Sequence, residues 1–304
     1  MYSKDEEIRP GELHRGKICA VVITYNPGPG FQQRLQLVAN QVTRTVIVDN
    51  GSTRSVLAML HSLSNEMNVE LILNHENLGV SHALNQGVTW ASLNRFEWIL
   101  TMDQDSVVKN NMIERLSEIF NYLHPKNSIG VIGSNYCDQY GRYWKPKIKT
   151  DFPWVERPVV ITSGSLISIR ACLAVGGFCD DLFIDQVDHD YCIRLRKQGY
   201  MVCKSTEPLM THTIGNITRQ QFFGVYLYTT NHKAFRRYYI ARNRIVLAKK
   251  YFLTEPIFVI CELYRMIGEI VAIVLLEKEK TQKLRAITIG LLHGITGRMG
   301  QVRV

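Results

Sequence analysis

The sequence predicts an α/β protein: a doubly wound, mostly parallel sheet with helices on both faces, followed by a basic, helical C-terminal extension. Short apolar stretches alternate with helical patterns through the first 123 residues. Successive residues of these stretches are apolar, which indicates strands buried on both faces, as in a parallel sheet. Polar turns follow three of the strands, at the edge where such sheets bind ligands.

The elements of the first half are predicted in this order. Strands are expected at 17–26, 45–52, 69–73 and 97–102, the second of them ending in a polar turn. Between them, apolar residues recur every three or four positions, which predicts helices. These helices are centred near Leu35, Leu60 and Leu84, and a further helix is expected from about 109 to 123.

The second half is less regular. Strands are expected at 128–136 and 159–169, the latter interrupted by Ser163-Gly164-Ser165, with a loop at 138–157. The acid-rich residues 178–190 lead into a helix that Gly199 ends. A strand at 200–204 follows.

Chain length indicates the domain organisation, and cysteine usage indicates the cellular compartment. The 304 residues are enough for one large domain or two modest ones, and the expected divisions are a polar arm (1–16), a main domain (17–230) and a C-terminal region (231–304). The arm has no apolar core of a signal peptide. Seven scattered cysteines, never in C-x-x-C spacing, predict reduced thiols in a cytoplasmic protein.

The positive charge is confined to the C-terminal region. Residues 231–304 contain 14 Lys and Arg against 5 Asp and Glu, which equals the net charge of +9 for the whole chain. This charge coincides with long apolar runs, so it favours an anionic membrane surface and disfavours nucleic acid as the partner.

The apolar run 257–276 is long enough to span a membrane, but Glu262, Arg265 and Glu269 form one polar stripe on it. Charges in mid-span are unfavourable in hydrocarbon, so we expect an amphipathic helix. It is expected to lie on a membrane or to pack in a homodimer; an ordinary helical subdomain is the alternative. Basic clusters flank it, at Arg236, Arg237, Arg242, Arg244, Lys249 and Lys250 before, and Lys278, Lys280, Lys283 and Arg285 after.

Two carboxylates follow the fourth strand, at Asp103 and Asp105. In a strand, side chains two positions apart point the same way, and two acids on one face favour a cation between them. A polar strand end without a ligand is the alternative. The chain has neither G-x-G-x-x-G after its first strand nor G-x-x-x-x-G-K-[ST], which disfavours dinucleotide and P-loop folds.

A set of short motifs resembles a known family. The arrangement is similar to the inverting glycosyltransferases of family 2, which have the GT-A fold, and the resemblance covers about residues 17–250. Within that family it looks most like the bacterial rhamnosyltransferases of surface polysaccharide and O-antigen synthesis. The matching pieces are Val22-Ile23-Thr24-Tyr25-Asn26, Val48-Asp49-Asn50-Gly51-Ser52, Asn77-Leu78-Gly79-Val80, Ala83-Leu84-Asn85-Gln86-Gly87, Met102-Asp103-Gln104-Asp105, Phe183-Ile184-Asp185, Val187-Asp188-His189-Asp190, His212 and Tyr239-Ile240-Ala241-Arg242-Asn243.

The resemblance implies a nucleotide-sugar site. Asp49 would bond an imide N–H of the pyrimidine, which thymine and uracil have; an Asx turn that closes the strand is the alternative. Arg242 would clamp the diphosphate, unless it lies on a solvated helix face. Thr24, Tyr25, Asn26, Asn77, Gly79, Asn85, Asp103, Gln104 and Gly164 would line the same site.

A metal site is also implied. Asp103 and Asp105 would hold Mg²⁺ or Mn²⁺, which neutralises the departing diphosphate. His212 would reach the metal or the diphosphate, although a lone histidine is as often structural.

The resemblance places the catalytic base at Asp188, with Asp185 as the second candidate. Val187 stands where the family more often has Glu, so the first acid of the usual pair is absent. Like charge from Asp185 and Asp190 is expected to raise the proton affinity of Asp188. Helix N-capping is the alternative for these acids, Asp190 above all.

Together these features predict a metal-dependent inverting rhamnosyltransferase that uses dTDP-L-rhamnose. The acceptor is expected to be a lipid-linked oligosaccharide, with the enzyme peripheral on the inner face of the cell membrane. A family 2 transferase with a UDP-hexose donor is one alternative. A non-catalytic nucleotide- or glycan-binding relative is another, which the acids at 49, 103, 105 and 188 disfavour.

Overall fold

The computed structural model describes residues 13, 15–67, 69–123, 125–138, 150–212, 215, 217–222 and 225–302. Residues 1–12 and 14 of the predicted arm and residues 139–149 of the predicted loop lie outside the described residues. The chain divides into two compact units. The first contains residues up to 77 together with 83–177 and 191–212, and the second contains 78–82, 178–190 and the residues from 213 onward.

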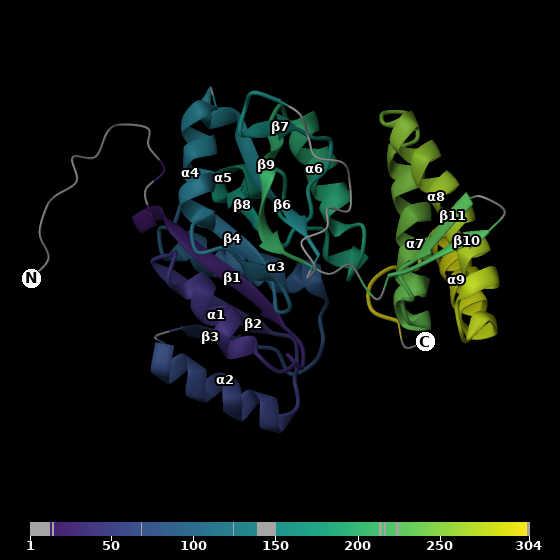
Figure 1. Ribbon diagram of the computed structural model, residues 1–304, viewed down its shortest axis with the longest axis horizontal. Coiled ribbons are helices and arrows are strands. Elements are labelled where there is room, and N and C mark those ends of the chain that lie inside the picture. Colours follow the sequence, from purple (N-terminus) through teal and green to yellow (C-terminus); the bar gives the residue numbers. More distant parts are fainter. Residues whose placement is uncertain are drawn as a thin grey trace, which may run out of the picture. The chain divides into compact units, whose positions relative to one another are not determined.

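The first unit is built on one mixed sheet (Figure 1). Within the described residues its strand order is β3-β2-β1-β4-β8-β6-β9-β5, and β7 also pairs with β9. The pairs β3–β2, β2–β1 and β1–β4 are parallel, as predicted. The strands are β1 Ile18–Thr24, β2 Arg44–Asp49, β3 Glu70–Leu73, β4 Trp98–Asp103, β5 Val107–Val108, β6 Ile129–Cys137, β7 Trp154–Glu156, β8 Ser165–Ser168 and β9 Met201–Thr211.

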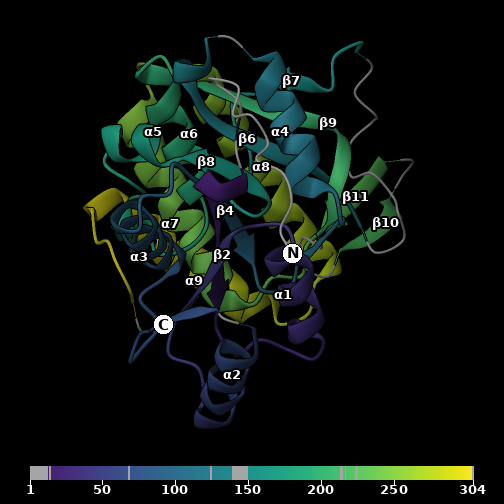
Figure 2. The same cartoon turned by 90° about the vertical axis from the view of Figure 1, so that its left-hand side faces the viewer.

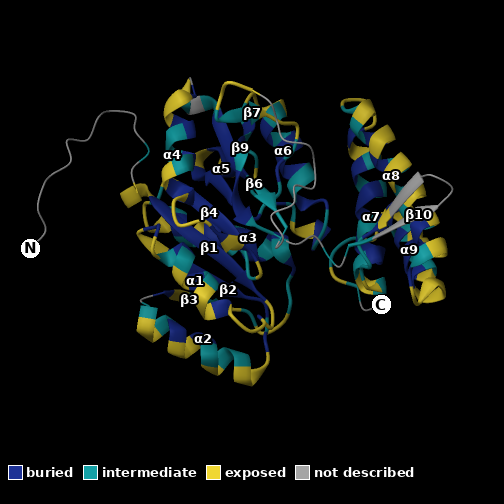
Figure 3. Cartoon of the chain, viewed as in Figure 1, coloured by how far each residue is buried: buried dark blue, intermediate teal, exposed yellow. Residues whose placement is uncertain are grey.

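Helices cover both faces of this sheet (Figure 2). The helices are α1 Phe31–Ala39, α2 Arg54–Met67, α3 Val80–Leu93, α4 Met112–Tyr122, α5 Ile169–Ala174 and α6 Val187–Lys197. Alternate residues of β1, such as Ala20 and Val22, share one hydrophobic core with α1, α2 and α4. Val21 points to the other face, where it packs against Gly87 of α3. Every residue of β1 is buried, so the apolar pattern of the strand matches its place inside the sheet (Figure 3).

The second half of the sheet differs from the sequence prediction. β8 is antiparallel to both β4 and β6, and it occupies only residues 165–168 of the predicted strand 159–169. β9 is longer than predicted, because β6, β7 and β5 all pair along it. β7 lies in the predicted loop 138–157. These antiparallel pairs join segments far apart in the sequence, which apolar periodicity alone does not reveal.

The second unit is mainly helical. Its helices are α7 Ala234–Tyr251, α8 Pro256–Leu276 and α9 Lys280–Thr296, and its hairpin consists of β10 Thr218–Phe222 and β11 Val225–Thr229. Helices α7 and α9 lie side by side (Figure 1), and Tyr238 Oη lies 2.8 Å from His293 Nδ1. The hairpin was not predicted from the sequence.

The polar stripe predicted on α8 faces α7. Glu262 is buried and accepts a hydrogen bond from Arg244 Nε (2.9 Å), and Glu269 accepts one from Arg244 Nη2 (2.6 Å). The opposite side of α8 is therefore apolar and exposed. In the described part of the chain, no helix combines the length and apolar character that a membrane span requires.

Much of the predicted basic flank is paired inside the second unit. Arg237 contacts Glu277 (2.5 Å), and Lys283 contacts the same carboxylate (2.8 Å). Arg242 and Arg244 are buried. Exposed basic residues of the predicted flanks are Lys249 and Lys250 before α8, and Lys278, Lys280 and Arg285 after it.

Candidate active site

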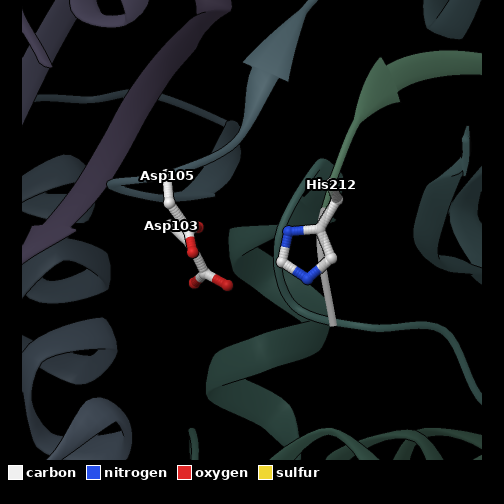
Figure 4. A group of neighbouring side chains, drawn as sticks. All are labelled: Asp103, Asp105 and His212. Atoms are coloured by element: carbon white, nitrogen blue, oxygen red, sulfur yellow. The ribbon is translucent and has the colours of Figure 1, made fainter. Parts of the chain in front are cut away.

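Asp103, Asp105 and His212 meet at the carboxyl edge of the sheet (Figure 4). One ligand atom from each residue lies within 4.8 Å of the others, and the carboxylates face the imidazole. Asp105 is exposed, while Asp103 and His212 are half-buried. Two carboxylates and one imidazole suit Mg²⁺ or Mn²⁺, so this donor set fits a divalent cation.

A pair of strands that are far apart in the sequence explains why His212 reaches the two acids. β5 begins two residues after Asp105 and pairs antiparallel with the end of β9, where Val107 lies opposite Thr211. His212 is the next residue, so the β5–β9 pair brings it back to the Asp103–Asp105 turn. The sequence analysis did not predict β5, although His212 itself was a candidate.

A serine pair orients this cluster, and the sequence analysis did not single out Ser106. Ser106 Oγ lies 2.8 Å from His212 Nδ1 and 2.9 Å from Ser163 Oγ. Ser163 Oγ in turn accepts a hydrogen bond from Asp103 N (3.1 Å). The contact with Ser106 fixes the imidazole and leaves Nε2 as the nitrogen available to an ion.

Gly164 lies in a loop inserted between β4 and β6. It has a φ of +71°, and its N–H donates to Thr101 O (2.8 Å) while its carbonyl accepts from Ser134 N (2.9 Å). An added Cβ would lie 2.4 Å from Ser134 Oγ. The position therefore requires glycine. This loop interrupts the predicted strand 159–169 and places Ser163 beside Asp103.

Asp49 is buried and forms the turn after β2. Its carboxylate accepts from Thr24 Oγ1 (2.8 Å), from Ser52 Oγ (2.6 Å) and from Ser52 N (2.8 Å). These bonds are the Asx-type turn that the sequence analysis held as the alternative. About one of the four lone-pair positions of a carboxylate is left. The pyrimidine contact stays a prediction.

The loop after β1 is fixed to the loop after β4. Gln104 Oε1 accepts from Tyr25 N (2.7 Å), and Gln104 Nε2 donates to Tyr25 O (3.2 Å). Arg34, which the sequence analysis missed, donates to Gln104 O (2.9 Å). Asn26 Oδ1 accepts from Thr53 N (3.0 Å). The amide of Gln104 thus holds the backbone of Tyr25, whose ring is half-exposed.

Asn77 and Asn85 belong to the first unit and Gly79 to the second. Gly79 has a φ of +91°, and an added Cβ would lie 2.6 Å from Phe183 O. Asn85 Oδ1 lies against Gly177. Contacts of these residues with a nucleotide sugar stay predictions.

Arg242 lies in the second unit, and its side chain is not on a solvated helix face. Its guanidinium is fully buried and donates to Asp181 O (3.0 Å), Leu182 O (3.0 Å) and Asn243 Oδ1 (2.9 Å). It also stacks on Tyr239, 4.7 Å from the ring centre. Backbone carbonyls thus accept from part of the guanidinium, which holds the side chain in place. The contact of Arg242 with a diphosphate stays a prediction.

The two candidate bases lie in the second unit. Asp188 lies in the first turn of α6, and its Oδ1 accepts from His189 N and contacts His189 Nδ1, both at 2.9 Å. Asp185 forms a bidentate pair with Arg236, with oxygens 2.9 Å and 3.1 Å from its nitrogens. Asp190 accepts from Lys250 Nζ and Tyr251 Oη, both at 2.7 Å, so it joins α6 to α7.

The electrostatics differ from the expected pattern. Burial would raise the pKa of Asp188, but the charge and hydrogen bonds of His189 outweigh burial and lower it. Burial raises the pKa of Asp185 despite its pair with Arg236. The expectation of a raised proton affinity at Asp188 is therefore wrong, because the neighbouring imidazole has more effect than the surrounding acids.

Three comparisons with known proteins agree with this geometry. The model of the family "Glycosyl transferase family 2" matches residues 19–173. The dTDP-rhamnosyl transferase RfbF of Shigella flexneri is 27% identical over 93% of this chain and 97% of its own length. Glycosyltransferase GlyG of Streptococcus pneumoniae is 29% identical over 42% of each chain.

Solved structures share the fold. TarS of S. aureus, in complex with UDP-GlcNAc, has a TM-score of 0.62 and 14% identity, covering 92% of this chain and 81% of TarS. The mannosyltransferase PcManGT of Pyrobaculum calidifontis, in complex with GDP-Man and Mn²⁺, has a TM-score of 0.56 and 16% identity, covering 98% of this chain and 80% of PcManGT. The predicted α/β fold of the GT-A type is confirmed. The family model spans about half of the chain, including Asp49, Asp103 and Asp105, and the chain therefore belongs to glycosyltransferase family 2.

Proposed function

We propose that the protein is an inverting rhamnosyltransferase that moves L-rhamnose from dTDP-L-rhamnose to a hydroxyl of a glycan acceptor. The similarity to the dTDP-rhamnosyl transferase RfbF carries this proposal, since it extends over 93% of the chain. Asp49, with its remaining acceptor position, suits the imide N–H of thymine. Asp103, Asp105 and His212 would hold Mg²⁺ or Mn²⁺, which neutralises charge on the leaving diphosphate.

A donor screen tests this function. The measurement is nucleoside diphosphate release from dTDP-L-rhamnose, UDP-glucose and UDP-N-acetylglucosamine, each with and without EDTA. We expect release from the dTDP donor alone, and its loss in EDTA. Release from a UDP-sugar only would support the UDP-hexose alternative. Release unchanged by EDTA would exclude the metal, and no release from any donor with an acceptor extract would favour a non-catalytic relative.

Asp188 is the proposed base that takes the proton of the acceptor hydroxyl as the hydroxyl oxygen attacks the anomeric carbon. Its lowered pKa keeps it ionised at neutral pH, so it is ready to accept the proton. We expect Asp105→Ala and Asp188→Ala to fold and to lose transfer. Wild-type turnover in purified Asp188→Ala would shift the assignment to Asp185.

The acceptor is proposed to be a lipid-linked oligosaccharide, reached by a peripheral enzyme on the cytoplasmic face of the membrane. The exposed side of α8 supports this: Ile257 is 79% and Tyr264 is 77% exposed. Exposed lysine and arginine side chains lie just after the end of α8, and their positive charge complements anionic lipid. The apolar row comprises Ile257, Ile260, Tyr264, Ile267, Val271, Val274 and Leu275.

Vesicle co-sedimentation tests the membrane surface. We expect binding to vesicles that contain phosphatidylglycerol, weaker binding to pure phosphatidylcholine, and loss of both in Ile260→Ser/Ile267→Ser. Leu93→Ser is the control, since it changes an exposed leucine of the first unit. A homodimer that the double variant dissociates, without vesicle binding by the wild type, would assign the row to a second copy instead.

A further inference from the structure

The segment before Asp188 has an unfavourable backbone. Phe183, Asp185 and Gln186 all have a φ of +64°, a region that residues with a side chain rarely adopt. Such conformations persist only when surrounding contacts hold them, and they cluster at functional sites. The contacts that hold this segment therefore indicate how Asp188 is placed.

Asn243 of α7 makes the central contacts. Its side chain is fully buried, and Nδ2 lies 2.9 Å from Leu182 O, 2.8 Å from Ile184 O and 2.9 Å from Asp185 O. One amide group thus contacts three carbonyls of the segment that leads to Asp188.

Arg242 fixes the direction in which Asn243 points. Arg242 Nε donates to Asn243 Oδ1 (2.9 Å), so the amide nitrogen must face the carbonyls. The same guanidinium also donates to Asp181 O and Leu182 O. Arg242 and Asn243 together define the backbone from 181 to 185.

Further contacts hold both ends of the segment. Arg236, which precedes Asn243 in α7, binds the carboxylate of Asp185. Lys250, which follows Asn243 in the same helix, binds the carboxylate of Asp190. Arg236, Asn243 and Lys250 are seven residues apart, so they share one face of the helix. Gln186 Nε2 donates to Glu262 of α8 (3.0 Å). Asp188 lies between these anchors in the sequence, and its carboxylate contacts the backbone N–H and the imidazole of His189.

We infer that Asn243 is a positioning residue, which holds the backbone of 182–185 so that Asp188 is presented to the acceptor hydroxyl. This inference rests on the proposed role of Asp188 as the base. In this view α7 and α8 are part of the catalytic apparatus in addition to any role at a membrane.

The test compares Asn243→Ala and Asn243→Asp with the wild type. Asp keeps the size and the acceptor for Arg242 but presents an oxygen to the carbonyls. We expect kcat to fall about 100-fold in both variants, because displacement of a reacting group by about 1 Å has that effect. The KM for dTDP-L-rhamnose should change by less than about 3-fold, since the lost interaction acts in the transition state.

Tyr238→Phe is the matched control, because it removes a buried polar contact of α7 with His293 that does not involve the segment. Its kcat should be that of the wild type. Arg236→Gln provides a milder variant in case Asn243→Ala does not fold, since the Arg236 side chain is 42% exposed. We expect its kcat to fall about 10-fold, again with little change in KM.

A double-mutant cycle separates positioning from general damage. If Asn243 acts through Asp188, then Asn243→Ala added to Asp188→Ala should lower the residual rate by less than about 3-fold. A further 100-fold loss in that background, or a wild-type kcat in Asn243→Asp, would overturn the inference while leaving the base assigned. Full turnover in Asp188→Ala would overturn both the base and the inference.

Discussion

At the scale of single residues, the cluster of Asp103, Asp105 and His212 depends on neighbouring serine side chains that are not members of it. Ser106 holds the imidazole of His212 at Nδ1, and Ser163 joins Ser106 to the backbone of Asp103. Residues that orient ligands in this way commonly tune metal affinity nearly as strongly as the ligands do. The two serines therefore help to define the site.

Ser106→Ala should weaken Mn²⁺ binding by about 10- to 100-fold, because the imidazole loses the contact that orients it. Isothermal titration of the purified protein with MnCl₂ measures the change. Ser128→Ala is the control, since its hydroxyl binds only Pro125 O among the described contacts. Equal Mn²⁺ affinity in Ser106→Ala and the wild type would show that His212 is not a ligand.

The Asp188–His189 pair leads to a pH prediction. The pKa of Asp188 lies below its ordinary value of 3.8, so it should produce no acidic fall in kcat/KM between pH 5 and 8. In His189→Gln the burial of Asp188 is no longer opposed by the imidazole, and the fall should move to higher pH. Transfer rates from pH 4.5 to 9 measure it. An acidic limb near pH 6 in the wild type would contradict the lowered pKa.

The same pair affects stability. The lowered pKa of Asp188 stabilises the fold above pH 3.8, and this contribution disappears as the pH falls. The pKa of His189 is raised, because Asp188 outweighs burial, so its contribution is complete below pH 6.5 and disappears as the pH rises through the raised value. The unfolding free energies of wild type and His189→Gln should therefore differ most between about pH 4 and 6.5.

The sequence predicted the candidate metal ligands better than it predicted the residues that contact them. Asp103, Asp105 and His212 follow from a motif and a family resemblance, and they do meet. Ser106 and Arg34 were missed because their contacts cross 57 to 106 positions of the chain, which local patterns do not reveal. The contacts that Arg242 makes could not be foreseen, because its partners are backbone carbonyls about 60 positions earlier in the chain.

At the scale of elements, the buried strands were predictable and the pairing of the later strands was not. Residues 17–26 and 97–102 are apolar on both faces because helices cover both faces of β1 and β4. β5 has two residues, too few to show a period, yet it brings His212 to the acids. α8 was correctly expected to be amphipathic. Its charged stripe faces α7, and its apolar side faces outward.

Glu277, at the end of α8, provides an element-scale prediction. It is buried and accepts from Arg237 (2.5 Å), Lys283 (2.8 Å) and the Thr229 hydroxyl. Glu277→Ala leaves two buried cations without this partner, which should lower the unfolding free energy by about 3–5 kcal/mol. The exposed Glu279→Ala should change it by less than about 0.5 kcal/mol. Urea unfolding measures both, and equal midpoints would show that the buried pairs contribute no net stability.

At the scale of the whole molecule, the second unit is made of segments that are far apart in the chain. Residues 78–82 and 178–190 are grouped with the C-terminal helices, although the predicted catalytic domain 17–230 includes them. The carbonyls of 181–185 find their donors on Arg242 and Asn243. The C-terminal tail joins the same unit, where Gly300 N donates to Asp181 O (3.0 Å).

A chain that ends at residue 230 should therefore fail as a catalytic domain. Without α7 the positive-φ residues 183, 185 and 186 lose the donors that hold them, and each such residue is unfavourable by about 1–3 kcal/mol. Buried carbonyls without partners add to this instability. We expect the shortened chain to aggregate or to melt well below the full chain by circular dichroism, and to release no dTDP. Co-expressed residues 231–304 should restore part of the activity, because the lost contacts can form between separate chains. Full activity of residues 1–230 alone would mean that α7 does not hold the Asp188 segment and that the C-terminal helices serve another purpose.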